Sequence, residues 1–266
     1  MKADLGAQSA ARALLGPPRW RFATVPAVAA VVAWTLIIPL ALTGNLAMIH
    51  HHELFRVGSP SALGLVGFVL GWQVMVVAMM VPSSLPVLAA IGEGGRPPAP
   101  RHGRQAAFVV GFLAVWTAFG VLALLGDAQV HALARSSAWF FTHAGLVTAA
   151  LFLAVGAHQL LAPVAWCERL DGSAVARSAE AGWRPLLRAG FDHGLSGVVG
   201  CWSLMLLMFT AGVGNIAWML ALTPLIAYQR WGRERVMVSR AAGVAALLFG
   251  IALLLPLVPF SGPAGL

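Results

Sequence analysis

Charged residues are scarce in this chain of 266 residues: Asp, Glu, Lys and Arg make up 10% of it, whereas 59% of the residues are hydrophobic. Soluble globular domains contain about 25% charged residues, so the composition excludes an ordinary soluble domain. Apolar stretches of roughly 20 residues, the length that a helix needs to cross a bilayer, recur along the sequence. We therefore expect a polytopic membrane protein.

The sequence has a single lysine, Lys2, which lies outside every apolar stretch. A retinal protein needs a lysine within its helical bundle to form a Schiff base, and a Walker-type phosphate loop needs a lysine after its glycines. The His-Glu-x-x-His motif of zinc proteases is also missing. Gly194-Leu195-Ser196-Gly197 is similar to the serine motif of rhomboid proteases, but no histidine follows it to act as a base. These absences exclude retinal proteins, ATPases and the familiar hydrolases.

Cysteine is almost absent as well, with only Cys167 and Cys201 in the chain. Cys167 falls in a polar connecting segment and Cys201 falls in the middle of an apolar one. Two cysteines in such different environments are not expected to form a structural disulfide. A thiol inside an apolar segment then serves either packing or metal binding.

Seven apolar segments are long enough to be spans, near residues 22–43, 61–91, 105–127, 139–162, 187–211, 214–229 and 241–258. This pattern predicts an all-α fold, a polytopic membrane helical bundle of about seven transmembrane helices. We expect residues 1–21 to be a flexible cytoplasmic N-terminus, residues 22–258 a single transmembrane helical domain and residues 259–266 a short external tail. The first apolar segment exceeds the roughly 7–15 residues of a signal-peptide core. We therefore expect it to remain as an anchor.

The basic residues predict the orientation. All of the 17 Lys and Arg residues except Arg56 and Arg135 fall in the N-terminal segment or in alternate connecting segments. Cytoplasmic loops collect Lys and Arg, so the N-terminus is expected in the cytoplasm of a multi-pass protein of the bacterial inner (plasma) membrane. Because the charges are spread over four short segments, they indicate contact with membrane lipid and no nucleic-acid partner.

One helical face in the segment 187–211 carries imidazole and sulfur. His193, Gly197, Cys201, Met205 and Met208 follow each other at helical spacing. Ionisable side chains within a membrane are costly and point to function, and cysteine with methionine forms a ligand set that suits Cu(I). This face is the first candidate for a metal site.

The segment 61–91 provides further thioethers in Met75, Met79 and Met80. It is expected to run antiparallel to the segment 187–211, which would bring the two midpoints to a similar depth. Two prolines follow, Pro82 and Pro86, and their missing N–H groups are expected to kink or break the helix. If the two helices are neighbours, six residues could form a metal site: Met75, Met79, Met80, His193, Cys201 and Met205. Ordinary core packing explains the methionines and Cys201 equally well.

A second group of candidate ligands is expected on the outer side of the membrane. It consists of His50, His51, His52, Glu53 and His143, together with Asp127 and His131. Imidazole and carboxylate suit Cu(II), Zn or Fe, so these residues could collect ions for the buried thioethers. They could equally be solvated loop residues.

A third group faces the cytoplasm and could form an exit for the metal. It contains His102, His158, Cys167 and Glu168, with His193 beside them. His143 and His158 share one face of the segment 139–162, but they are 15 residues apart, so one metal cannot bind both. Each could instead be a haem ligand with a partner on another helix.

Four motifs carry a resemblance to a known family. They are Met79-Met80-x-Pro82 with Pro86, Gly190-x-x-His193-Gly194-Leu195, Cys201-Trp202-x-Leu204-Met205, and Gly212-Val213-x-Asn215-x-x-Trp218-Met219. Over roughly residues 60–235 the chain resembles the uncharacterised bacterial family of predicted metal-binding integral membrane proteins, some of which are labelled copper chaperones. In that family two further cysteines stand where this chain has Gly197 and Gly200, and a methionine often stands where it has Gly214.

The residues and the resemblance together predict an integral membrane protein that binds or handles a soft transition metal, copper first, in a chaperone or transfer-like role. Transfer by ligand exchange needs no bond chemistry, which argues against an enzyme. Its partners would be copper proteins or a membrane oxidase or oxygenase complex. Two alternatives stay open: a non-catalytic accessory or structural subunit of a larger membrane complex with a degenerate metal site, and a haem or copper membrane redox enzyme.

Overall fold

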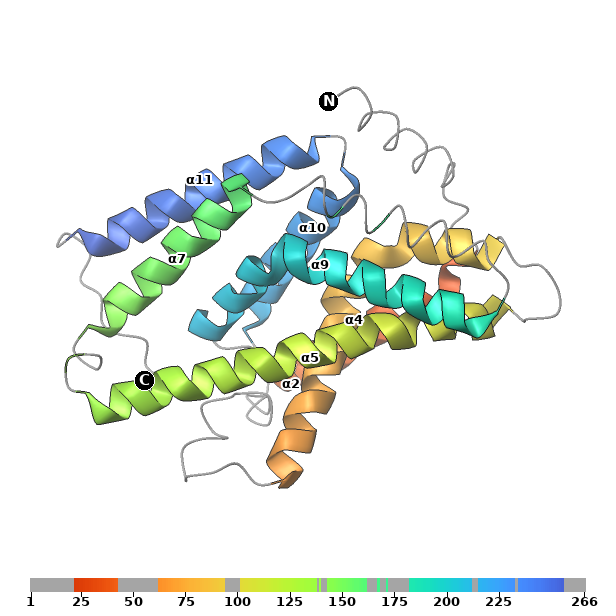
Figure 1. Cartoon of the computed structure of the whole chain (residues 1–266), viewed down its shortest axis with the longest axis horizontal. Helices are drawn as coiled ribbons and strands as arrows, with labels where there is room; N and C mark the ends of the chain where they lie inside the picture. The colour runs from red at the N-terminus through yellow and green to blue at the C-terminus, as the bar shows by residue number, and fades with distance from the viewer. Residues whose placement is uncertain are drawn as a thin grey trace. The chain divides into compact units, whose positions relative to one another are not determined.

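The computed structural model describes residues 22–42, 62–93, 101–137, 139, 143–161, 167, 171, 182–211, 215–232 and 234–255. In these residues it contains seven long α-helices and no strand (Figure 1). The helices are α2 (Thr24–Leu42), α4 (Ala62–Glu93), α5 (Arg101–Ser136), α7 (Ala144–Leu161), α9 (Trp183–Ala211), α10 (Ile216–Trp231) and α11 (Arg235–Leu254). They coincide with the seven predicted apolar segments, so the predicted all-α helical bundle is confirmed.

Five of these helices are long and apolar enough to cross a membrane: α2, α4, α5, α9 and α11. The other two are shorter, since the apolar part of α7 covers Gly145–Leu161 and α10 has 16 residues. Large apolar side chains lie exposed on these helices, among them Leu36 at 53% and Leu248 at 63%. Exposed leucines along a long helix are compatible with a lipid-facing surface. The predicted terminal segments, 1–21 and 259–266, lie outside the described residues, and the orientation of the chain stays a prediction.

The contacts between residues divide the chain into two compact units. Unit 1 contains Met1–Leu36, Gln73–Phe119 and Pro163–Gly200, and unit 2 contains Ile37–Trp72, Gly120–Ala162 and Cys201–Leu266. The boundaries fall inside α2, α4, α5 and α9, so each of these helices contributes residues to both units.

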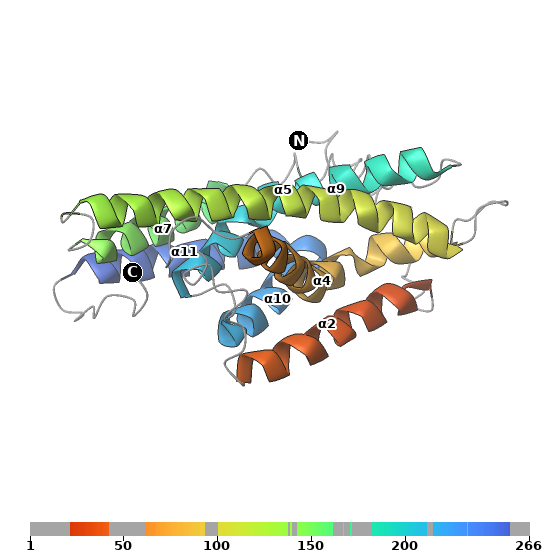
Figure 2. The same ribbon diagram turned by 90° about the horizontal axis from the view of Figure 1, so that it is seen from below.

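In unit 1 the backbones of α5 and α9 approach closely (Figure 2). A Cβ added at Gly190 would lie 1.9 Å from the carbonyl oxygen of Phe108, and one added at Gly111 would lie 2.1 Å from that of Leu187. Only a residue without a side chain fits at such distances, which is the reason small residues mark helix contacts in membranes. The two glycines therefore determine how near α9 lies to α5.

Prolines inside α4 leave backbone carbonyls without their usual partners. Pro82 has no N–H to donate to the carbonyl of Ala78, one helical turn earlier. The indole Nε1–H of Trp34 on α2 donates to that oxygen instead, at 3.0 Å. The helix runs without interruption through Pro82 and Pro86, and α4 bends along its course in Figure 1; of the kink or break expected from the prolines, only the break is wrong. A side chain from a neighbouring helix replaces the missing donor.

In unit 2, Gln159 of α7 is the centre of a polar network that joins four helices. Its Oε1 accepts hydrogen bonds from Gln229 Nε2 at 3.1 Å and from Ser239 Oγ at 2.9 Å. Its Nε2 lies 3.4 Å from the hydroxyl of Ser203, and its backbone carbonyl accepts from Ser239 Oγ at 3.0 Å. Gln159 is 2% exposed. Since these partners belong to α9, α10 and α11, one buried amide connects all three helices to α7.

Helix α7 also packs along α11, as the two ribbons show in Figure 1. A Cβ at Gly243 would lie 3.0 Å from the carbonyl of Gly156, so the two helices approach closely where each has a glycine.

Helix α10 begins at Asn215, whose Oδ1 accepts from the N–H groups of Ala217 and Trp218 at 3.1 and 3.2 Å. The asparagine of the fourth motif is therefore an N-cap, a position that asparagine favours.

Candidate functional site

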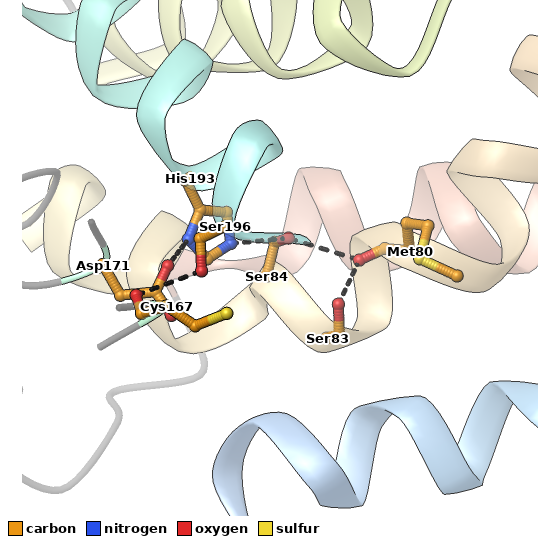
Figure 3. Close-up of polar contacts among 7 residues, drawn as sticks. All are labelled: Met80, Ser83, Ser84, Cys167, Asp171, His193 and Ser196. Carbon is orange, nitrogen blue, oxygen red and sulfur yellow. Dashed lines mark hydrogen bonds and ion pairs between the residues drawn. The ribbon is translucent and has the colours of Figure 1, made fainter. Parts of the chain in front are cut away.

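His193 is a fully buried residue of α9 whose ring contacts polar groups at two edges. Its Nδ1 lies 2.9 Å from Asp171 Oδ1, and its Nε2 lies 3.0 Å from the hydroxyl of Ser84 on α4 (Figure 3). Asp171 belongs to the segment before α9, and its side chain is 25% exposed. All three residues belong to unit 1. They form a row that leads from a partly exposed carboxylate through the imidazole to a buried hydroxyl.

The row continues to the backbone of α4. The Ser84 hydroxyl donates to the carbonyl oxygen of Met80 at 3.2 Å, and the Ser83 hydroxyl donates to the same oxygen at 2.7 Å. A serine inside a helix often bonds the carbonyl one turn earlier, and here both serines stand between Pro82 and Pro86. Ser84 consequently has one hydroxyl hydrogen and two neighbours that could accept it, the Met80 oxygen and the imidazole nitrogen.

The remaining surroundings of the imidazole include two aromatic rings of α5. The ring centre of Phe108 lies 5.5 Å from that of His193, and the ring centre of Phe112 lies 5.9 Å away. The glycine contacts of α9 with α5 bring these phenyl groups near, because Gly190 meets the backbone of Phe108 and Gly194 that of Phe112. The imidazole is thus held among apolar rings and away from solvent.

A second polar contact of unit 1 lies next to this row. The hydroxyl of Ser196, fully buried, donates to the carbonyl oxygen of Cys167 at 3.1 Å (Figure 3). The Cys167 sulfur would lie 3.7 Å from a Cβ at Gly200. Residues 193, 196 and 200 share a face of α9, so the backbone and the thiol of Cys167 pack on the face that carries His193. Neither Cys167 nor Cys201 forms a disulfide with any residue in the described segments.

The six residues of the predicted metal site are all buried, with exposed fractions of 0 to 3%. Unit 1 contains Met75, Met79, Met80 and His193, and unit 2 contains Cys201 and Met205. Helices α4 and α9 are neighbours where Ser84 meets His193, one turn beyond Met80, as the antiparallel register predicts. Met80 enters the row of contacts through its carbonyl oxygen, and its thioether points away from His193 in Figure 3. The convergence of all six side chains on one metal stays a prediction.

The outer group lies mostly beyond the described part of the chain, since His50, His51, His52 and Glu53 fall in residues 43–61. His143 is described, and its ring stacks on Trp139 with ring centres 4.6 Å apart. Its Nδ1 also lies 2.8 Å from the carbonyl oxygen of Trp139. The predicted capture site therefore stays a prediction, and the contacts shown for His143 are local.

The described members of the inner group are divided between the two units. His158 of α7 has its Nδ1 2.9 Å from the Ser203 hydroxyl and its ring beside Trp202, all within unit 2. His102 lies exposed at the start of α5, and Glu168 lies outside the described residues. In the described segments no group of three or more His, Cys, Asp and Glu side chains is placed to hold a metal ion. Cys167 is the member of this group that packs on the same helix face as His193.

Sequence reasoning missed Asp171 and Ser84. Asp171 stands 22 residues before His193 in a connecting segment, and no spacing rule links the two. Ser84 left a signal, because a polar pair between two prolines in an apolar helix needs partners inside the bundle. None of the motifs indicated that the Ser84 hydroxyl contacts His193 on another helix.

The order of the three groups, carboxylate, imidazole and hydroxyl, determines what the row can do chemically. An ionised carboxylate only accepts hydrogen bonds, and a neutral imidazole has one N–H and one lone pair. A histidine that donates one ring N–H to a carboxylate and presents the other nitrogen elsewhere is the arrangement common at protein metal sites. Here Nε2 points at a small hydroxyl on the helix that also carries the buried methionines.

Comparison with protein families matches residues 69–253 to a family described as PpoB2, copper chaperone. The matched range includes α5, α7, α9, α10 and most of α4 and α11. Neither the curated proteins nor the solved structures gave a significant match.

Proposed function

Since the chain belongs to the PpoB2 family of copper chaperones, we propose that it binds Cu(I) within the membrane and passes it to another copper protein by ligand exchange. The observation that carries this proposal is the row in which Asp171, His193 and Ser84 follow each other inside unit 1. An ionisable side chain buried within an apolar helical bundle is energetically costly, so a buried histidine indicates a function. A carboxylate that orients it supplies the arrangement seen for metal-binding imidazoles.

Ligands that suit Cu(I) lie on the same helix as Ser84, α4. Met75, Met79 and Met80 precede Ser84 by one to three turns and are all buried. Thioether and imidazole are suitable donors for Cu(I). We propose that His193 and these methionines are copper ligands in unit 1, with the Met80 thioether turning toward the ion, and that Cys201 and Met205 of unit 2 also bind copper.

The wider role is also a proposal. Copper would be cargo, exchanged between ligands without the making or breaking of covalent bonds in a substrate, so no enzymatic activity is invoked. The five helices that are long and apolar enough to cross a membrane favour the bacterial inner membrane as its location. The recipient would be a copper protein, such as a membrane oxidase or oxygenase complex.

The test is a Cu(I) titration of the full-length protein in detergent under anaerobic conditions, against a chromogenic Cu(I) chelator. We expect roughly one tightly bound ion, and a loss of at least 10-fold in affinity for His193→Gln, Met79→Leu and Cys201→Ser. Met237→Leu is the matched control, because this methionine of α11 is 64% exposed and lies outside the proposed site. Its affinity should equal that of the unmodified protein.

Two results would contradict the proposal. In the first, the unmodified protein folds but its affinity for Cu(I) is no higher than that of the His193→Gln variant. The other is equal affinity in all four variants, which would leave the methionines and Cys201 as packing residues. A metal-free protein that purifies together with a larger membrane complex would favour the accessory subunit instead.

A further inference from the structure

The ring of His193 is fixed in one orientation by contacts on opposite edges. A rotation of the ring by half a turn would place carbon atoms where Nδ1 and Nε2 now stand, and both polar contacts would be lost. The phenyl groups of Phe108 and Phe112 offer no polar replacement. The hydrogen bonds therefore assign a direction to each nitrogen: Nδ1 toward Asp171, and Nε2 toward α4.

The carboxylate also decides which nitrogen carries hydrogen. Asp171 Oδ1 accepts, so Nδ1 is the N–H donor, and in the neutral ring Nε2 is left with its lone pair. A lone pair is what a metal ion needs from imidazole. Of the two nitrogens, Nε2 is the one that can bind copper without the loss of the Asp171 contact.

The Ser84 hydroxyl lies 3.0 Å from Nε2, on the side of the ring where a metal would bind this nitrogen at about 2.0–2.1 Å. It has an alternative partner, because the Met80 carbonyl oxygen lies 3.2 Å from it. A turn about the Cα–Cβ bond of a serine is a rotamer change between staggered wells. This turn moves the hydroxyl away from Nε2, and the Met80 carbonyl oxygen keeps a partner because it also accepts from the Ser83 hydroxyl at 2.7 Å.

We infer that Asp171 is the positioning residue of the copper site, and that the Ser84 hydroxyl is the placeholder that copper displaces from His193 Nε2. This inference rests on the proposed function and deepens it, since it names the ligand atom and the group that directs it. Asp171 need not touch the metal. It acts through the imidazole, from a side chain that is 25% exposed at the edge of unit 1.

Nitrogen NMR of the full-length protein tests the positioning role without copper. With ¹⁵N-labelled histidine, the His193 signals are assigned by their loss in His193→Gln, and we expect them to report the Nδ1–H tautomer. Asp171→Ala should produce a mixture of the two tautomers, whereas Asp171→Asn keeps an acceptor at the same place and should retain part of the preference. Asp192→Asn is the matched control, because it removes the same charge one residue from His193 and outside the row. Its His193 signals should stay unchanged.

Cu(I) titration of the same variants tests the link to the metal. Removal of the group that orients a metal-binding histidine costs about 10- to 100-fold in metal affinity. We expect that loss for Asp171→Ala, a smaller one for Asp171→Asn, and no loss for Asp192→Asn. Ser84→Ala should bind Cu(I) with unchanged or higher affinity, since nothing has to be displaced.

The outcomes separate this inference from the proposed function. Failure of the unmodified protein to bind Cu(I) overturns the proposed function and the assignment of Nε2 as ligand, while the tautomer result still decides whether Asp171 orients the ring. Binding that is lost in His193→Gln but kept in Asp171→Ala, with an unchanged tautomer, overturns the positioning role alone. A loss of affinity in Ser84→Ala as large as that in His193→Gln overturns the placeholder role, because the hydroxyl would then be a ligand. Asp171→Asn, which changes one atom of the side chain, keeps the positioning test decisive if Asp171→Ala does not fold.

Discussion

Replacement of Gly190 by alanine tests the contact that places α9, and with it His193, against α5. The added Cβ would lie 1.9 Å from the Phe108 carbonyl oxygen, whereas ordinary van der Waals contacts begin at 3.4 Å. The two backbones would have to separate by about 1.5 Å at this point, the difference between these distances. A carbonyl cannot turn aside as a flexible side chain can. Overpacking costs about 1–3 kcal/mol, and we expect Gly190→Ala to lower the free energy of unfolding by an amount near the top of that range. About 0.5–1 kcal/mol of this loss is offset, because alanine is more stable than glycine within a helix.

Two other glycines make this a graded series. A Cβ at Gly194 would meet Val115 Cβ at 3.0 Å, a milder overlap, and a Cβ at Gly126 would meet nothing within 4 Å. Thermal unfolding in detergent should rank Gly190→Ala as the least stable, Gly194→Ala as intermediate, and Gly126→Ala as equal to or more stable than the unmodified protein. If Gly190→Ala unfolds at the same temperature as Gly126→Ala, the close approach of α5 and α9 is refuted. Because Phe108 also flanks His193, we expect Gly190→Ala to weaken Cu(I) binding while Gly126→Ala leaves it unchanged.

Three further predictions concern other contacts. Trp34→Phe removes the donor that serves the Ala78 carbonyl and should lower the free energy of unfolding by about 1–3 kcal/mol; an unchanged value would mean that another group serves this oxygen. Gln159→Leu removes the side-chain acceptor of the Gln229 amide, while Ser239 keeps the backbone carbonyl of residue 159; it should cost about 1–3 kcal/mol, measured by denaturant titration against the exposed control Met237→Leu. Excess Cu(I) at about 100 times the dissociation constant should stabilise the folded protein by about 2.7 kcal/mol, seen as a higher unfolding temperature that is absent in His193→Gln.

The helices and the chemical character of α9 could be predicted from sequence because both depend on local patterns. Apolar runs long enough for a bilayer identify spans one at a time, and His193 stands out because an ionisable group within such a run is costly. The antiparallel register of two spans even predicts that His193 lies one turn beyond Met80, where it meets Ser84. Helical rise alone is enough for that estimate.

The partners of His193 could not be predicted because they depend on contacts between distant segments. Asp171 reaches the ring from a connecting segment, where an aspartate is most often solvated. The way the bundle accommodates the prolines without a break could not be predicted for the same reason. The loss of a backbone donor at Pro82 is visible in the sequence, but its replacement by the indole of Trp34, 44 residues from Ala78, belongs to the tertiary structure.

The complete burial of His193 beside Phe108 and Phe112 has a consequence for kinetics. A chelator in solution cannot touch an ion on Nε2 until the surrounding helices part, and such local opening proceeds at its own rate. Release to a small molecule should consequently reach a plateau as the chelator concentration rises. A physiological recipient that docks on the protein and promotes the opening would exceed that plateau, and this excess would distinguish directed delivery from leakage.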